Sequence, residues 1–280
     1  MSKTTRPVPS WNGVSAGGTA TLNLPIGLTY HGLVHYLQGT TFGLVELAEM
    51  RFKINGREIY VMTGGDLDVS NKYEGLSAFD AANDLLSQYF DRPRLKTRQN
   101  TELTAIGTGA PFQNNPDVAF FNPTPATTFQ MEIDIAATAS APILTTKALQ
   151  SGASPLGAMV KRRRFNFSPS GAGDYEISDL PRGDAINKIW IKNTGDVTRV
   201  RLTRDNFLAF DRTVTENVKF QEDGGIRVPQ TNWFVIDPSE FGNGSEAIIS
   251  AVQDFRLTIT TSAAETLTVY VDYLGGLQGQ

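Results

Sequence analysis

The sequence predicts an all-β protein made of two tandem copies of one strand-rich unit. Twenty-six Gly and 14 Pro among 280 residues indicate many turns between short strands. A Leu-Pro-x-Gly step occurs at Leu24–Gly27 and again at Leu180–Gly183, and each is followed by an apolar run that ends at a glycine, Gly39 or Gly195. Positions 24 and 180 are 156 residues apart, and so are positions 39 and 195. Proline fixes φ and lacks an N–H, so such a step suits the join between two strands, and its recurrence at one offset predicts a duplication.

We divide the chain into an N-terminal arm at 1–18, a first unit at 19–140, a linker at 141–158 and a second unit at 159–280. The arm is rich in Pro and Gly and has little apolar patterning, so it is either a frayed terminus or an extended arm that lies on a neighbouring subunit. The linker is rich in Ala, Ser and Thr, and we expect a short helical turn near Thr145–Gln150 within it.

Apolar alternation places the strands of the first unit. Asn55-Gly56 lies between two of them and is a strong hairpin signal. We expect a helix over Leu76–Phe90, where apolar residues recur at near-helical spacing and Ser77 can cap the first turn. A long Pro-rich stretch follows, with loops such as 110–127 as candidate contact elements. The predicted strands are Thr21–Leu24, Tyr30–Leu37, Met50–Ile54, Glu58–Met62 and Phe129–Ile135.

The second unit repeats the plan in a more compact form. A helix is expected over Glu246–Asp254, capped by Ser245. Thr128–Ile135 also resembles Thr266–Tyr273, at an offset of 138, which predicts a second copy about 18 residues shorter than the first. Each copy has room for roughly eight strands and a helix. The predicted strands are Arg163–Phe167, Tyr175–Leu180, Ala185–Ile191, Val197–Leu202, Val218–Phe220, Trp233–Ile236, Phe255–Ile259 and Leu267–Tyr273.

Composition excludes several classes of function. The formal net charge of −4 and the pI near 5.3 argue against a dedicated nucleic-acid binder. The chain has no cysteine, which excludes disulfides, thiolate metal sites and cysteine nucleophiles. Residues 1–12 lack the apolar core of a signal peptide, and no apolar run approaches the length of a membrane span, so we expect a soluble protein made in a cytoplasm.

Candidate sites for chemistry are few. His31 and His35 fall on one face of a strand, and Glu46 or Glu49 could complete a metal site, but the spacing favours structural or surface histidines. The run from Asp66 to Asn71 begins like a calcium loop, which makes Asp66 and Asp68 candidate cation ligands.

That run departs from the calcium-loop pattern, since Asn71 stands where glycine is expected and Ser77 where glutamate is expected. A solvated turn is the favoured interpretation. No nucleophile elbow, phosphate loop, dinucleotide fingerprint or zincin motif occurs, so we expect no enzyme and no cofactor beyond that candidate calcium.

One basic cluster stands out, formed by Lys161, Arg162, Arg163 and Arg164 and followed by two phenylalanines. Basic residues interleaved with aromatic ones can bind nucleic acid or anionic lipid. The favoured alternative is a strand start whose arginines pair with carboxylates of a neighbouring subunit, because the planar guanidinium matches carboxylates well. We therefore treat the cluster as a candidate interface or membrane-facing site.

This cluster, together with segments in both halves of the chain, resembles the major capsid proteins of corticoviruses, tailless icosahedral bacteriophages with an internal membrane. The resemblance is carried in chain order over most of the length and is weakest at 72–121. It rests on these segments: Leu24–Tyr30, Met131–Ile135, Met159–Phe167, Glu176–Arg182, Ile189–Lys192, Phe255–Ile259 and Val269–Gly275.

The resemblance implies a double jelly roll, two eight-stranded sandwiches standing side by side. It further implies a virion protein whose three copies form a pseudo-hexagonal capsomer over an internal membrane. Its partners would be itself, neighbouring capsomers, a vertex protein and the membrane, with no direct nucleic-acid role. A lectin-like tandem jelly roll is the alternative, because Trp11, Trp190 and Trp233 could form sugar platforms, although Trp190 lies in an alternating strand typical of a core.

Overall fold

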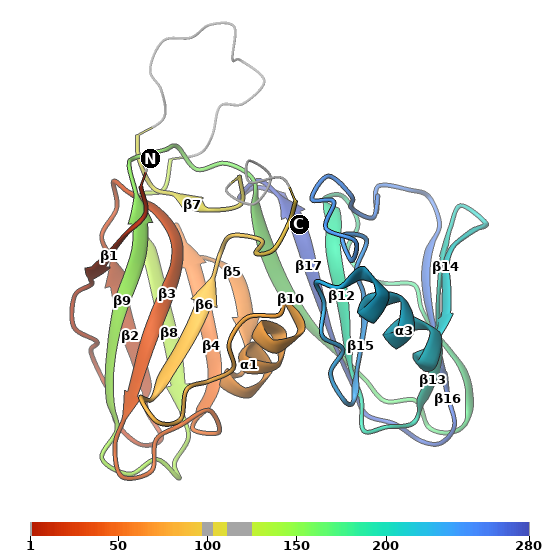
Figure 1. The fold of residues 1–280 in the computed structure, drawn as a ribbon, viewed down its shortest axis with the longest axis horizontal. Coiled ribbons are helices and arrows are strands. Elements are labelled where there is room, and N and C mark those ends of the chain that lie inside the picture. The colour runs from red at the N-terminus through yellow and green to blue at the C-terminus, as the bar shows by residue number, and fades with distance from the viewer. Residues whose placement is uncertain (1, 97–102, 111–124, 280) are drawn as a thin grey trace, which may run out of the picture.

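The structure is a computed structural model that describes residues 2–96, 103–110 and 125–279. Two β-sandwiches stand side by side, with helix α1 (Gly64–Tyr73) between them and helix α3 (Val214–Gly224) on the second sandwich (Figure 1). The all-β fold class predicted from the sequence is confirmed. Within the described residues, no helix has the length and apolar character needed to cross a bilayer.

The first sandwich packs a sheet in the order β1-β9-β3-β6 against strands in the order β2-β8-β4-β5, and the two-residue β7 is added beside β3. Leaving β7 aside, the neighbours are the first, eighth, third and sixth strands in one sheet and the second, seventh, fourth and fifth in the other. This is jelly-roll connectivity. The strands are β1 (Thr4–Pro7), β2 (Thr19–Leu24), β3 (Thr29–Gln38), β4 (Leu47–Ile54), β5 (Arg57–Met62), β6 (Leu85–Tyr89), β7 (Ile106–Gly107), β8 (Phe129–Ile135) and β9 (Ile143–Ser151).

The second sandwich has the same connectivity, with the orders β10-β17-β12-β15 and β11-β16-β13-β14. In both sandwiches the helix follows the fifth strand. The double jelly roll implied by the family resemblance is therefore confirmed. The strands are β10 (Met159–Phe167), β11 (Gly173–Ile177), β12 (Ala185–Lys192), β13 (Val197–Arg204), β14 (Phe207–Thr213), β15 (Trp233–Ile236), β16 (Phe255–Thr261) and β17 (Leu267–Gly275).

One sheet is shared by both sandwiches. The edge strand β5 of the first sandwich pairs in parallel with β10, the first strand of the second, with Tyr60 opposite Arg162. This pairing joins four strands of each sandwich into an eight-stranded sheet. The two sandwiches are thus connected by backbone hydrogen bonds as well as by side chains.

The duplication is visible in the irregularities of the strands. The β3–β9 ladder shifts register between Tyr30 and Gly32, and the β12–β17 ladder shifts between Ile186 and Lys188, again 156 residues later. The β4–β5 hairpin has a bulge between positions 52 and 53, and the β13–β14 hairpin has one between 202 and 203, an offset of 150. Bulges are built features of a sheet, so their recurrence identifies equivalent positions.

The predicted offset of 138 is wrong. It matched β8, the seventh strand of its unit, with β17, the eighth strand of the other. The equivalent of β8 is β16, and their first residues, 129 and 255, differ by 126. Since 126 is 30 less than 156, the second copy is shorter by about 30 residues over this span, not 18. Alternating strands that cover similar cores have similar sequences, which explains the mismatch.

The Leu-Pro-x-Gly steps lie between equivalent strands, as predicted. Gly27 has φ of 112° and Gly183 has φ of 142°, values that favour glycine at both turns. A buried tyrosine fixes each turn by donating its hydroxyl to the proline carbonyl, Tyr30 to Pro25 at 2.5 Å and Tyr273 to Pro181 at 2.9 Å. The two tyrosines come from different strands, so the same contact is made in two ways.

Both predicted helices are wrong, and so is one strand. The 76–90 segment contains turns and then β6, and 246–254 contains a bridge and irregular backbone with bends. The helix of the first sandwich is α1, whose polar sequence is buried by specific contacts and carries no apolar stripe. Val218–Phe220, predicted as a strand, lies inside α3, which begins with a capping box between Thr213 and Glu216 and ends at Gly225 in the left-handed conformation.

The arm and the linker also take part in the first sandwich. Residues 4–7 form β1, which pairs with β9, and Trp11 is buried in the core of this sandwich. Residues 143–151 of the predicted linker form β9 itself, so the helical turn expected there is wrong. Its buried face includes Thr146 and Gln150 beside Leu144 and Ala148, and these polar residues hid the alternation from a hydrophobic pattern.

His35 lies in this core as a neutral side chain. Thr146 accepts a hydrogen bond from the indole N–H of Trp11 at 2.9 Å, so its own hydroxyl is free to donate to Nδ1 of His35, also at 2.9 Å. That arrangement leaves the imidazole proton on Nε2. Complete burial without a counter-charge lowers the pKa of His35 to about 3.

We predict that His35 makes the protein less stable as the pH falls. The unfolded chain protonates this histidine near pH 6.5, whereas the folded chain does so only near pH 3. The contribution of His35 to the free energy of unfolding is therefore fully present above pH 6.5 and is lost as the pH falls from 6.5 to 3. In His35→Gln, the free energy of unfolding should fall less steeply between pH 6 and pH 4, by about 1.4 kcal/mol per pH unit. Urea unfolding at pH 7, 6, 5 and 4 measures this, and parallel curves for both proteins would contradict it.

Candidate functional site at the junction of the two sandwiches

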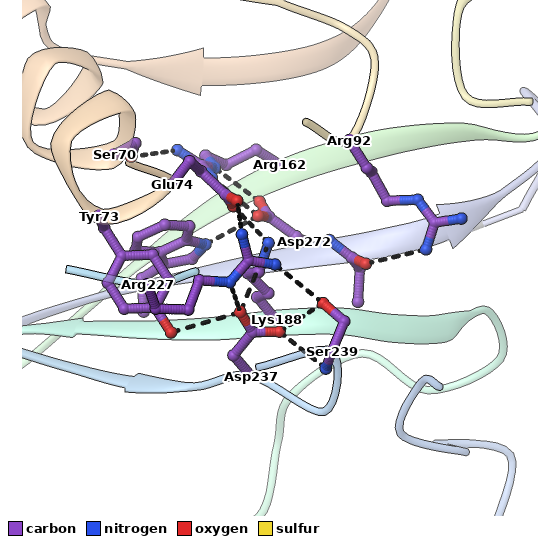
Figure 2. A network of polar contacts seen from close by, with 12 residues as sticks. Ser70, Tyr73, Glu74, Arg92, Arg162, Lys188, Arg227, Asp237, Ser239 and Asp272 are labelled. Atoms are coloured by element: carbon purple, nitrogen blue, oxygen red, sulfur yellow. Dashed lines mark hydrogen bonds and ion pairs between the residues drawn. The ribbon is translucent and has the colours of Figure 1, made fainter. Parts of the chain in front are cut away.

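Helix α1 joins the two sandwiches through a buried polar cluster. Thr63 caps the helix by accepting from the backbone N–H of Asp66 at 3.1 Å. The helix and its C-cap residue then present four side chains to the outer face of strands β10, β12 and β17, the face that points away from the second core. Figure 2 shows Ser70, Tyr73 and Glu74 among them. The four are Asp66, Ser70, Tyr73 and Glu74.

The centre of this cluster is an ion pair between Arg162 and Asp272, both buried. Nε and Nη2 of Arg162 donate to the two carboxylate oxygens at 2.6 and 2.7 Å, and the indole of Trp190 donates to the same carboxylate at 2.7 Å. The remaining Nη1 of Arg162 reaches Ser70 on α1 at 3.0 Å. This fork geometry satisfies both charges without water, and the carboxylate raises the pKa of Arg162 against the effect of its burial.

A second group contains two cations and two anions. Arg227 contacts Glu74 of α1 and donates through Nε to Asp237 at 2.7 Å, while Lys188 contacts Glu74 and lies 3.7 Å from Asp237. Burial alone would raise the pKa of Asp237, but the charges of Lys188 and Arg227 hold it below its usual value. The hydroxyl of Tyr73 also donates to Asp237, at 3.3 Å. Because positive and negative charges balance, the group can remain ionised away from solvent.

Aromatic rings fill the space around these charges. Tyr73 of α1 packs edge-on against Trp190, with ring centroids 4.9 Å apart. The guanidinium of Arg162 lies over both Tyr60 and Trp190, at 5.0 and 4.9 Å from the ring centroids. Burial raises the pKa of Tyr60 to about 12, so its hydroxyl stays neutral. The junction therefore holds the two sandwiches in one relative orientation.

Neither the candidate calcium loop nor the favoured solvated turn fits the structure, because residues 66–71 lie in α1 and both aspartates are buried. Asp66 and Asp68 lie on α1, not in a loop, and their carboxylates have separate partners. Asp66 accepts from Tyr270 at 2.5 Å and from Lys192 at 2.7 Å, whereas Asp68 accepts from the backbone of Phe79 at 2.5 Å. Within the described residues, no three His, Cys, Asp or Glu side chains are grouped to hold a metal ion.

The two histidines contact different partners. Nδ1 of His31 lies 3.0 Å from Asp91, and Nε2 lies 2.8 Å from Ser151. Lys3 contacts the same Asp91 at 2.6 Å. His31 therefore helps to attach the N-terminal strand, while His35 belongs to the core, and the structural interpretation of both is favoured.

The basic cluster is mostly internal. Lys161 contacts Asp184 at 2.5 Å, Arg162 binds Asp272, and Arg164 pairs with Glu49 of the first sandwich. The predicted carboxylate partners exist, but they belong to the same chain rather than to a neighbouring subunit. Arg163, the remaining member, is half-buried at the seam. Buried Lys161 and Arg162 are not available to a membrane.

The three tryptophans do not form exposed sugar platforms. Trp11 and Trp190 are buried, and Trp233 is stacked on Tyr270 with its ring centroid 6.2 Å away. The carbohydrate-binding alternative therefore loses the observation that favoured it.

Two jelly rolls in tandem, fused through a sheet and fixed by a buried charged junction, define a protein of the double jelly-roll capsid class. Solved structures agree. The major capsid protein P2 of bacteriophage PM2 matches all of this chain and all of its own, with a TM-score of 0.86 and 25% identity. The crystal structure of the STIV MCP matches 99% of this chain and 98% of its own chain, with a TM-score of 0.69 at 8% identity, which shows the fold alone.

The chain belongs to the viral coat protein P2 family. The model of the family's N-terminal domain matches residues 5–151, and that of its C-terminal domain matches 159–277. The major capsid protein P2 of Pseudoalteromonas phage PM2 is 25% identical over 273 residues, covering 94% of this chain and 93% of that protein. The chain is thus a structural component of a virion, and the prediction that it is not an enzyme is confirmed.

We predict that removing the charge of Asp272 destabilises the protein strongly. Asp272→Asn leaves the buried guanidinium of Arg162 without a counter-charge, which should lower the free energy of unfolding by about 3–5 kcal/mol. Urea unfolding at one fixed protein concentration measures the change. The control is Asp174→Asn, which breaks the exposed pair with Arg201 and should have no measurable effect.

Replacing both members of the buried pair tests the same idea. The double variant Arg162→Met, Asp272→Leu removes both charges and should recover much of the loss. Equal stabilities for Asp272→Asn and Asp174→Asn would show that the junction does not depend on this ion pair.

Proposed function

We propose that this coat protein is the major capsid subunit and that three copies form a capsomer with six similar lobes. The observation that carries the proposal is the repeated jelly roll, because two equivalent lobes per chain, held in one orientation, give a trimer a nearly hexagonal outline. The full-length likeness to the major capsid protein of phage PM2 supports it. Assembly would then depend on surfaces buried between copies, with no chemical step.

The remaining partners are proposed on the family resemblance. Capsomers would contact one another and a vertex protein, and they would cover an internal membrane. The basic cluster does not support the membrane contact, because two of its members are buried and a third is paired. The net charge of −4 is consistent with a shell that has no direct role in binding nucleic acid. The Pro-rich contact loop expected at 110–127 lies largely outside the described residues.

We predict a trimer in solution. Multi-angle light scattering at micromolar concentration should give three times the 30.5 kDa chain mass, about 92 kDa, and electron microscopy should show particles with a hexagonal outline. A monomer at every concentration tested would contradict the capsomer. Specific binding on a glycan array would instead support the carbohydrate-binding alternative.

A further inference from the structure

The strand pairing that joins the two sandwiches inside the chain involves two strands whose equivalents lie at sheet edges, one at each end of the molecule. Inside the chain, the fifth strand of the first sandwich (β5) pairs with the first strand of the second (β10). The equivalent fifth strand of the second sandwich is β14, and the equivalent first strand of the first sandwich is β1. Each is the last strand of its sheet among the described residues.

Both edges are accessible. All four residues of β1 are exposed, and β14 begins with Phe207, Leu208 and Ala209, also exposed. Exposed edge strands are templates for pairing with another chain. Figure 1 shows β1 and β14 at opposite ends of the long axis, so one copy can present β14 to β1 of the next in a head-to-tail contact.

We propose that β14 of one copy pairs in parallel with β1 of the next copy, repeating the in-chain junction between β5 and β10. The proposal rests on the trimer proposed above and specifies the surfaces that form it. Three such contacts would close a ring of six jelly rolls.

The register of this pairing follows from the duplication. In each sandwich, one residue of the eighth strand pairs on one side with the residue that follows the bulge, Gly32 or Lys188, and on the other side with a residue of the first strand. That first-strand residue is Thr5 in the first sandwich and Arg162 in the second, so Thr5 corresponds to Arg162. At the offset of 150 shared by the two hairpins, Phe210 corresponds to Tyr60. Since Tyr60 is opposite Arg162 within the chain, Phe210 is placed opposite Thr5 of the next copy.

The outer face of the first sandwich supplies the surface that α3 would cover. In the second sandwich the equivalent face is buried under α1. In the first sandwich, the equivalents of Trp190 and Lys192 at the 156 offset are Val34 and Tyr36, both half-buried. Ile143 and Tyr89 on the same sheet are 56% and 37% exposed. This partly apolar face, which also carries Lys147, has no helix of its own chain packed on it as α1 is packed on its counterpart, within the part of the chain that the structure describes.

Helix α3 is less buried within its own chain than α1, as expected of a helix that packs against a neighbouring copy. Only Asn217 and Gln221 of α3 are buried, whereas most of α1 is buried. Phe220 on α3 is 46% exposed, and Phe241 beside the end of the helix is 47% exposed. Apolar side chains would therefore meet the apolar face of the next copy.

The charges are complementary as well. Asp66, the third residue of α1, accepts a hydrogen bond from Tyr270 of the second sandwich. Its equivalent in α3 is Glu216, since both follow a capping threonine by three residues. The equivalent of Tyr270 is Lys147, because Lys147 lies opposite Val34 as Tyr270 lies opposite Trp190. A carboxylate on α3 would thus face an exposed lysine on the next copy.

Cysteine cross-linking tests the register, and the chain has no native cysteine to interfere. In the double variant Thr5→Cys, Phe210→Cys, directly opposed residues of adjacent strands fall within disulfide range. Oxidation should yield covalent dimers and trimers that a reductant reverses. Each single variant should give no covalent trimer, and Thr5→Cys with exposed Leu208→Cys controls for random collision and should react far less.

The outcomes separate the two proposals. A trimer by light scattering that does not cross-link through Thr5→Cys and Phe210→Cys overturns this interface and leaves the trimer standing. A chain that remains a monomer overturns both. If Phe210→Cys fails to fold, because Phe210 packs against Phe234 in the second core, the next opposed pair, Arg6→Cys with Asp211→Cys, replaces it.

A charge reversal on the first sandwich tests the helix contact independently. Lys147→Glu should raise the dissociation constant of the trimer at least about tenfold, because the new carboxylate would face Glu216 of the next copy. The melting temperature of the monomer should not change, since Lys147 is exposed. Arg182→Glu is the matched control on an exposed turn of the second sandwich. Equal dissociation constants for the two variants would refute the docking of α3 on this face.

Discussion

The structure depends on the ion pairs that are buried between the two jelly rolls. Arg162 and Asp272 neutralise each other, and the two acids beside Arg227 and Lys188 balance those cations. Removing charges from water is costly, so such a cluster is tolerated only when the geometry satisfies every group. An apolar junction would allow the lobes to slide. A set of directional hydrogen bonds does not, because displacement leaves buried charges unpaired.

The two lobes show how one backbone plan accommodates different chemistry. The bulges between Tyr30 and Gly32 and between Ile186 and Lys188 occupy equivalent places, yet the neighbouring outer faces carry different residues, Val34 in one and Trp190 in the other. The bulged residues themselves, His31 and Asn187, are both buried and hydrogen-bonded. Duplication therefore preserved the path of the chain, while the outer faces diverged according to what covers them.

The sequence predicts the structure correctly where buried apolar residues recur at a regular spacing. Alternating strands such as β8 were predicted nearly residue by residue, and the Leu-Pro-x-Gly steps identified the repeat. Prediction failed where polar residues are buried, because the apolar period is then absent. Strand β9 buries Thr146 and Gln150, and α1 buries Asp66 and Asn71, so both were missed. The start of helix α3 could have been predicted, because Thr213 and Glu216 have the spacing of a capping box in the sequence. The ion pairs of Arg162 with Asp272, Lys188 with Glu74 and Arg227 with Glu74 join residues 110, 114 and 153 positions apart, which no local pattern reports.

The eight-stranded sheet that crosses both lobes has a mechanical consequence. A lateral pull on the subunit acts along the direction of the hydrogen bonds between β5 and β10, so these bonds are loaded one after another as the seam peels open. Parallel pairing at this seam is short, with one registered pair. The side-chain cluster under α1 therefore bears part of the applied force. As a result, the contacts at the seam break together instead of one after another.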